Sequence, residues 1–166
     1  MLFRSLHPEV LKLLEKKKQL PTQLYVSMNA PNKRLFHVWH HSSIKDSWNR
    51  YNETLSLIKK LNKKTRTVLR MTLVKDKNMK KEHIKEYAEL IKKASPNFVE
   101  VKSFMSVGFS RKRLGYETMP NFQEIQDYAK QLAKETKLKV LDSHEFSRII
   151  LLGRNKKTMK IKKEEI

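Results

Sequence analysis

Apolar residues recur at helical spacing in four segments, and each segment predicts an amphipathic helix. In the second segment, Trp48, Tyr51 and Leu55 fall on one face, and Ser43 with Asp46 has the spacing of a capping box at the helix start. The predicted helices cover residues 5–18, 43–61 and 80–94 and a segment that begins at Asn121.

Strands are predicted between these helices, from short runs rich in apolar and β-branched residues. The runs cover residues 22–29, 67–75, 98–105, 139–142 and 147–153. Because strands and helices alternate, we expect right-handed crossovers and a parallel sheet, as in doubly wound folds and (β/α) barrels. In both architectures, ligands bind at the carboxyl ends of the strands. We expect one α/β domain over residues 1–153, followed by a mobile basic tail over residues 154–166.

The first three strands each have an apolar face and a polar face, because side chains alternate along a strand. In the second strand, Leu69 and Met71 share one face, whereas Arg70 and Thr72 share the other. In a closed interior, charged groups on the polar face have to pair with one another or with a ligand carboxylate or phosphate. An antiparallel sheet with one solvated side is the alternative. The polar positions are Tyr25, Ser27, Asn29, Arg70, Thr72, Glu100 and Lys102.

The charge of the chain favours a polyanionic partner. There are 37 Lys and Arg residues against 17 Asp and Glu residues, a formal net charge of +20, and we expect the partner to be RNA or DNA. A protein from a hot habitat would also be rich in Lys, but Glu would rise with it. An acidic membrane surface is less favoured, since no Lys-rich amphipathic helix presents Trp or Phe.

A cytoplasmic location is expected, with no membrane span. No apolar stretch approaches the roughly 20 residues that a spanning helix needs. The first ten residues, "MLFRSLHPEV", become polar too early for a signal peptide.

The sequence contains no cysteine, which excludes a disulfide framework, a thiolate nucleophile and an iron–sulfur cluster bound by this chain alone. His37 and His41 have the helical spacing of a zinc-binding pair, but no third ligand is near, and a surface turn is the favoured interpretation. Ser143, His144 and Glu145 are consecutive and do not predict a catalytic triad. We therefore predict no metal site and assign no catalytic residue.

Four segments carry a family resemblance: "LPTQLYVSMNAP", "TRTVLRMTLVKDKNM", "NFVEVKSFMSVGFSRKRL" and "DSHEFSRIILLG". In this order and spacing they resemble the carboxyl half of 4-demethylwyosine synthase, a radical S-adenosylmethionine (SAM) enzyme of wybutosine biosynthesis in tRNA. The resemblance runs from His7 to Gly153. The chain differs from the family pattern at Asn29, where Asp is usual, at His41 and Ser42, where relatives have Arg-Pro, and at Ser103, where Gly is usual.

The resemblance implies a partial (β/α) barrel, half of a TIM-like barrel with parallel strands and amphipathic helices. In the family, a [4Fe–4S] cluster cleaves SAM, and the resulting radical condenses pyruvate carbons onto N1-methylguanosine beside the anticodon of tRNA-Phe, which is a lyase reaction. The cluster cysteines of the family, including a CxxxCxxC loop, lie in its amino half. We therefore expect a separate N-terminal-half protein that completes the barrel and brings the [4Fe–4S] clusters, without which this chain is inactive.

The resemblance also suggests binding residues. Ser27 and Asn29 resemble SAM contacts, and pyruvate or phosphate groups are expected at Arg70, Thr72, Lys75, Glu100 and Lys102. From the basic charge, candidates for binding tRNA phosphates are Lys33, Arg34, Arg111, Lys112 and Arg113. Two alternatives remain open: a non-catalytic RNA-binding remnant of the enzyme, and a fragment of a longer protein.

Overall fold

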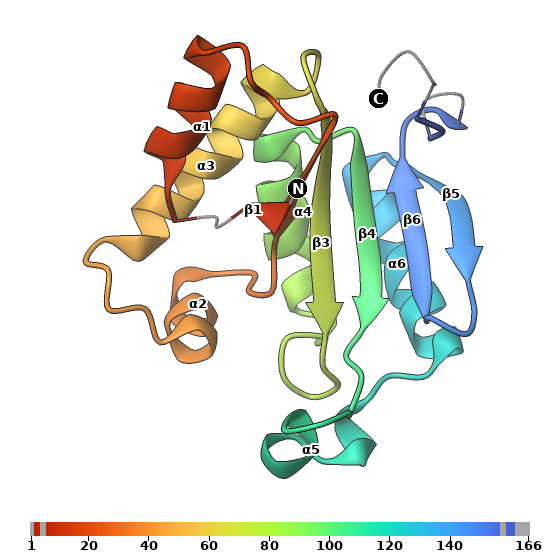
Figure 1. Ribbon diagram of the computed structural model, residues 1–166. Coiled ribbons are helices and arrows are strands. Elements are labelled where there is room, and N and C mark those ends of the chain that lie inside the picture. Colours follow the sequence, from red (N-terminus) through yellow and green to blue (C-terminus); the bar gives the residue numbers. More distant parts are fainter. Residues whose placement is uncertain (1, 4–5, 157–158, 162–166) are drawn as a thin grey trace.

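The structure is a computed structural model that describes residues 2–3, 6–156 and 159–161 (Figure 1). Over these residues the chain forms one six-stranded sheet with helices packed against it. The strands are β1 (Leu2–Phe3), β2 (Gln23–Ser27), β3 (Arg66–Leu73), β4 (Phe98–Ser103), β5 (Lys139–His144) and β6 (Ile149–Gly153). The helices are α1 (Pro8–Lys16), α2 (Lys33–His40), α3 (Ser47–Leu61), α4 (His83–Ala94), α5 (Ser110–Arg113), the 3-10 helix η1 (Tyr116–Thr118) and α6 (Phe122–Thr136).

The sheet is parallel only in part. Its strand order is β1-β2-β3-β4-β6-β5, and the first four strands in this order run parallel. The last two strands form an antiparallel hairpin, of which β6 pairs with β4. The prediction of a parallel sheet was therefore wrong for β6, whereas β5 runs in the same direction as β4 and pairs with β6. The reason is the length of their connection, because residues 145–148 suffice for a hairpin but not for a crossover between parallel strands.

One face of the sheet is covered by helices, as Figure 1 shows, and the other face is turned toward the viewer. Along the covered face, α1, α3, α4 and α6 contact one another in this order, and α6 also contacts β4, β5 and β6. The structure thus has two layers over its described part. The partial barrel that the family resemblance implied is not confirmed, because the described residues form an open sheet.

The core lies between the sheet and the helices. The apolar face predicted for each strand points into it, and Leu24, Leu69, Met71 and Val99 are completely buried. Burial of such a side chain contributes about 1.5–3 kcal/mol. The alternation of faces predicted for β2, β3 and β4 is confirmed, and the polar positions consequently lie on the open face.

The predicted helices all form, with different ends. The predicted capping box of Ser43 and Asp46 was wrong: Asp46 precedes α3 in a left-handed conformation (φ 62°) and its side chain caps no backbone group. A capping box occurs instead at α6, where Asn121 accepts from the Glu124 amide and Glu124 accepts from the Asn121 amide. Helix α2 was not predicted, although Asn32 caps it by accepting from the Leu35 amide at 3.0 Å.

The predicted basic tail, residues 154–166, falls partly outside the described residues. Two of its described residues contact the body of the protein. Arg154 donates to the Ser95 hydroxyl at 2.7 Å, and the Lys160 carbonyl accepts from Arg66 at 3.0 Å. In the part of the chain that the structure describes, no helix has the length and apolar character needed to cross a membrane.

Candidate functional site

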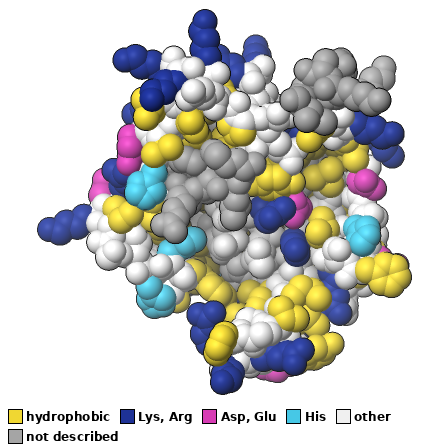
Figure 2. All heavy atoms as spheres, viewed as in Figure 1, with side chains coloured by type: hydrophobic (Ala, Val, Ile, Leu, Met, Phe, Trp, Pro, Cys, Tyr) yellow, Lys and Arg dark blue, Asp and Glu magenta, His cyan; other side chains and the backbone are white. Residues whose placement is uncertain are grey.

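The polar residues predicted from the strand pattern are brought together on the open face of the sheet. In the parallel register, Ser27 lies beside Arg70 and Arg70 lies beside Glu100. Two residues further toward the carboxyl ends, on the same face, Thr72 lies beside Lys102. The space-filling view of this face shows Lys or Arg side chains next to an acidic side chain near its middle (Figure 2). The sheet therefore carries a band of charged and polar groups.

Arg70 and Glu100 form an ion pair across β3 and β4. Arg70 Nη2 donates to Glu100 Oε2 at 3.2 Å, and Nε lies 2.8 Å from Oε1 but not in line for a hydrogen bond. The guanidinium also lies over the Tyr25 ring, 4.3 Å from its centroid. The Glu100 side chain is only 9% exposed and that of Arg70 36%. The two charges neutralise each other, and the remaining N–H groups of Arg70 are the ones left for a ligand.

A network around Asn78 joins the ends of β2 and β3. Asn78 is 1% exposed, accepts from the Val74 amide at 2.7 Å, and donates to the carbonyls of Asn29 at 2.8 Å and Thr72 at 2.9 Å. Asn29 Oδ1 in turn accepts from the Thr72 amide at 3.1 Å. This bond orients the Asn29 side chain, so its NH₂ group is the part that can donate to a ligand.

A cavity of about 540 Å³ opens at this end of the sheet. It lies between α2 and α5, beyond the carboxyl ends of β2, β3 and β4. Of the predicted ligand-binding residues on the open face, Asn29 and Thr72 line it. Those that do not line it are Ser27, Arg70, Glu100 and Lys102. The lining residues are Asn29, Val38, Trp39, His41, Thr72, Val74, Lys77, Asn78, Phe104, Ser110, Arg113 and Leu114.

A small apolar cluster supports this cavity. Val74, Phe104 and Met119 are buried together, and Trp39 and Leu114 pack against them. These side chains come from α2, from the ends of β3 and β4, and from the segment that follows α5. The cluster therefore fixes both walls of the cavity relative to the sheet. The sequence pattern did not reveal it, because its members are far apart in the chain and follow no period.

Lys75 was predicted to bind a ligand, but it has a partner within the protein. Its Nζ lies 2.7 Å from Glu124 Oε1, at the start of α6. Partial burial tends to raise the pKa of Glu124, but the hydrogen bond from Lys75, the bond from the Asn121 amide and the nearby charge of Arg148 outweigh burial and lower it. Lys75 thus ties the end of β3 to α6 rather than facing the cavity.

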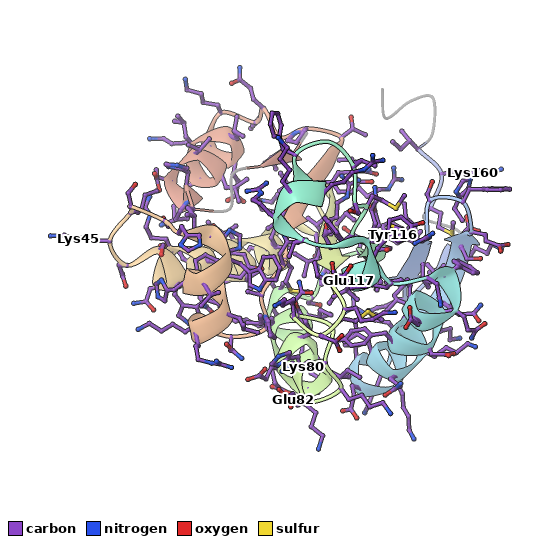
Figure 3. The ribbon with its side chains drawn as sticks, turned by 90° about the horizontal axis from the view of Figure 1, so that it is seen from below. Lys45, Lys80, Glu82, Tyr116, Glu117 and Lys160 are labelled. Atoms are coloured by element: carbon purple, nitrogen blue, oxygen red, sulfur yellow. The ribbon has the colours of Figure 1, made fainter. Side chains whose placement is uncertain are left out.

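Of the five residues predicted to bind tRNA, Arg113 lines this cavity, and the other four belong to the two helices that border it. Lys33 and Arg34 begin α2, and Arg111, Lys112 and Arg113 belong to α5. All five are exposed. Seen from the carboxyl ends of the strands, the α5 segment crosses in front of the sheet (Figure 3). The assignment of these five residues to tRNA binding stays a prediction.

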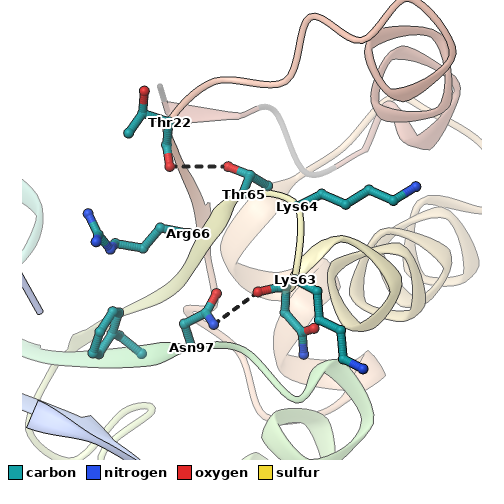
Figure 4. Close-up of a pocket in the computed structure, with 8 residues that line it drawn as sticks. Thr22, Lys63, Lys64, Thr65, Arg66 and Asn97 are labelled. Carbon is teal, nitrogen blue, oxygen red and sulfur yellow. Dashed lines mark hydrogen bonds between the residues drawn. The ribbon is translucent and has the colours of Figure 1, made fainter. Parts of the chain in front are cut away.

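A second cavity, of about 400 Å³, lies at the amino ends of β3 and β4 (Figure 4). Asn97 accepts there from the Thr67 amide at 2.8 Å and donates to the Asn62 carbonyl at 3.0 Å. Its side chain therefore joins the start of β3 to the loop that follows α3. Ligands of parallel α/β sheets bind at the opposite end. We therefore assign this cavity a structural role. Its lining residues are Thr22, Asn62, Lys63, Lys64, Thr65, Arg66, Asn97 and Phe98.

The residues present do not fit an iron–sulfur cluster, because the sequence contains no cysteine. Among the described residues, there is also no group of three or more His, Asp and Glu side chains that could hold a metal ion. His37 in α2 and His41 after it therefore lack the further ligands that a zinc site needs. SAM fits better, since the cavity offers the Asn29 amide and the Thr72 hydroxyl next to apolar walls.

Comparisons with known proteins agree with the motifs. Residues 93–154 match the model of the family described as wyosine base formation. The chain is 43% identical over 150 residues to the S-adenosyl-L-methionine-dependent tRNA 4-demethylwyosine synthase of Pyrococcus abyssi, and equally so to that of Pyrococcus horikoshii. Each alignment covers 89% of this chain and 42% of the relative. The synthase of Methanocaldococcus jannaschii is 36% identical over 132 residues, which cover 80% of this chain and 40% of that relative.

Solved structures show the same similarity in three dimensions. A structure of TYW1 with a lysine–pyruvate adduct bound superposes with a TM-score of 0.74 and 29% identity, over 94% of this chain and 46% of that one. A crystal structure of archaeal TYW1 gives a TM-score of 0.68 and 27% identity, over 96% of this chain and 47% of that one. The chain spans less than half the length of these relatives. The resemblance predicted from the motifs is thus confirmed: over nearly its whole length the chain is related to a part of 4-demethylwyosine synthase, the part that includes the wyosine base formation region.

Proposed function

We propose that this chain is the carboxyl half of a tRNA-modifying radical SAM enzyme. The enzyme would condense pyruvate-derived carbons with N1-methylguanosine beside the anticodon of tRNA-Phe to form 4-demethylwyosine. The single observation that supports this most directly is the cavity at the carboxyl ends of the parallel strands, lined by Asn29 and Thr72 and bordered by the basic helices α2 and α5. A polar interior beside a basic rim suits a small charged ligand and an RNA substrate.

In this proposal, the residues of the chain bind and orient. The Asn29 NH₂ group donates to an acceptor on SAM or on the pyruvate-derived substrate, because its oxygen is already bonded to the Thr72 amide. Lys102, which has no acidic partner among the described residues, attracts a carboxylate on the open face. The Arg70–Glu100 pair ties β3 to β4, the two strands whose carboxyl ends reach the cavity, and so limits their relative movement.

The redox chemistry would come from elsewhere in the enzyme. A [4Fe–4S] cluster together with SAM would supply the radical, and the cysteines for that cluster would belong to an amino half. That half is either a separate protein or a preceding part of the same polypeptide. In both cases the present chain contributes the wall of the site that faces cofactor and substrate.

Co-expression with a cysteine-bearing amino half from the same organism tests the proposal. After anaerobic cluster reconstitution, the pair is expected to form the tricyclic base on N1-methylated tRNA-Phe, whereas either half alone is not. Iron bound stoichiometrically to this chain alone would contradict the proposal. A stable, cluster-loaded complex that makes no product would favour the alternative, a non-catalytic RNA-binding remnant of the enzyme.

A further inference from the structure

The segment that carries α5 combines exposed apolar side chains with cations. Phe109 is 80% exposed and Tyr116 71% exposed, although both are large aromatic residues. Arg111, Lys112 and Arg113 lie between them in the chain and are exposed as well. Exposed aromatic rings interleaved with cations are the pattern of surfaces that bind unpaired nucleotides, where bases stack on rings and phosphates contact cations.

The geometry of the segment is fixed before any ligand binds. The Ser110 hydroxyl donates to the Val107 carbonyl at 2.6 Å and accepts from the Val107 amide at 3.0 Å, which closes the turn before α5. Gly108 adopts a positive φ of 56° in this turn, a conformation that favours glycine. Arg111 Nε donates to the Ser106 carbonyl at 2.9 Å. Phe109 is therefore presented to solvent by a constrained turn, which lowers the entropic cost of binding.

The charges next to Phe109 favour RNA as the occupant. Lys112 Nζ lies over one face of the Phe109 ring, 5.5 Å from its centroid, so a base that stacks on the opposite face has a cation close by for its phosphate. The chain as a whole carries a formal net charge of +20. An apolar protein partner would explain the exposed ring but not the three successive cations of α5.

The position of the segment relates it to the candidate site. Ser110, Arg113 and Leu114 line the cavity that Asn29 and Thr72 also line. Figure 3 labels Tyr116 and Glu117 on the same segment, across the carboxyl ends of the strands. An RNA loop that stacks on Phe109 therefore lies next to the opening of the cavity.

The geometry points to a stacking platform for unpaired nucleotides of an RNA loop, formed by Phe109 with Lys112 and extended by Tyr116. This inference rests on the proposed function, which supplies tRNA as the source of the loop. It adds that the aromatic rings recognise single-stranded RNA, whereas the cations alone would bind paired and unpaired RNA alike.

Binding of the full chain to an RNA hairpin with an unpaired loop, compared with a fully paired RNA duplex of equal length, tests the platform. Phe109→Ala is expected to weaken hairpin binding about tenfold and to leave duplex binding unchanged. Because the variant removes no charge, the salt dependence of hairpin affinity stays as in the unchanged protein. Phe109→Trp, which restores a ring, is expected to restore affinity, and Tyr116→Ala to weaken hairpin binding as well.

Phe146 provides a matched control. It is 92% exposed in the turn between β5 and β6, at the edge of the sheet, and Phe146→Ala is expected to leave hairpin binding unchanged. Equal hairpin affinity of Phe109→Ala and the unchanged protein would overturn the inference, as would loss of association with the amino half without loss of hairpin affinity. Product formation by a reconstituted enzyme that carries Phe109→Ala, with unchanged hairpin affinity, would refute the platform and leave the proposed function intact. If Phe109→Ala weakens hairpin binding as expected but the unchanged reconstituted enzyme forms no product, only the proposed function is refuted.

Discussion

Asn78 shows how one buried side chain can determine the shape of a site. It satisfies three backbone groups, the Val74 amide and the carbonyls of Asn29 and Thr72, at distances between 2.7 and 2.9 Å. All three groups belong to residues that line the cavity with it. The side chain thus replaces the hydrogen bonds that the sheet no longer provides where its strands end.

Replacement of Asn78 by alanine is expected to lower the free energy of unfolding by about 3 kcal/mol, because it leaves buried backbone groups without partners. Urea denaturation measures the change. Asn49→Ala is the matched control, since Asn49 is exposed and bonded only to Asp46 within the described structure. The control is expected to change stability by less than about 0.5 kcal/mol. Equal stabilities of the two variants would show that the network contributes nothing.

His40 makes a second prediction at this scale. It is half-buried in α2 with its ring stacked on Phe36, 4.3 Å between centroids, and burial lowers its pKa below the ordinary value of 6.5. The folded state therefore binds a proton less readily than the unfolded state. It follows that His40 costs no stability above pH 6.5 and destabilises the fold as the pH falls through that value.

The variant His40→Phe removes this titration and keeps an aromatic ring on Phe36. The difference in melting temperature between the variant and the unchanged protein is expected to grow in favour of the variant from pH 8 to pH 5, roughly over the range in which histidine titrates. Carboxylates titrate equally in both proteins and cancel in the difference. A difference independent of pH would contradict the assignment.

The sequence predicted single residues well where a period exists. Alternation placed Leu69 and Met71 in the core and Arg70 on the polar face, and the expectation that Arg70 and Glu100 neutralise each other is met. Asn78 was missed because its bonds depend on how the ends of β2 and β3 meet in space. The contact of Lys75 with Glu124 was missed because the two residues are distant in the chain.

At the scale of elements, the Arg70–Glu100 pair ties β3 to β4. Removal of one member of a buried pair leaves the other charge without compensation. Because Arg70 is partly exposed, we expect Arg70→Met to cost about 2 kcal/mol, less than a fully buried pair would. Adding Glu100→Gln is expected to recover about half of this loss, since the uncompensated charge disappears. Urea unfolding of the single and double variants measures the coupling, and strictly additive effects would contradict it.

The elements themselves were predicted with two errors that have the same origin. Helix α2 was missed although Asn32 stands three residues before Leu35, a spacing that indicates a helix start. The direction of β6 was wrong because the predicted parallel arrangement was extended to it, although only residues 145–148 separate it from β5. In both cases the segment is too short for its sequence pattern to determine the structure, which depends on tertiary contacts instead.

At the scale of the molecule, the cavity and a group of exposed cations lie at the same end. The parallel strands direct their carboxyl ends toward α2 and α5, and these helices carry the exposed cations Lys33, Arg34, Arg111, Lys112 and Arg113. The opposite end also has lysines, among them Lys16 and Lys17 at the end of α1. A net charge of +20 alone therefore cannot distinguish a binding face from a solvated one.

Salt dependence of tRNA binding distinguishes the two ends. Each phosphate contact releases counterions, so loss of one contact reduces the slope of log affinity against log salt by about 0.9. The double variant Lys33→Ala/Arg34→Ala is expected to reduce the slope by about 2. Lys16→Ala/Lys17→Ala removes the same charge at the other end and is expected to leave the slope nearly unchanged. If both double variants lower the slope equally, tRNA contacts the molecule without regard to the cavity, and the rim has no special role in binding.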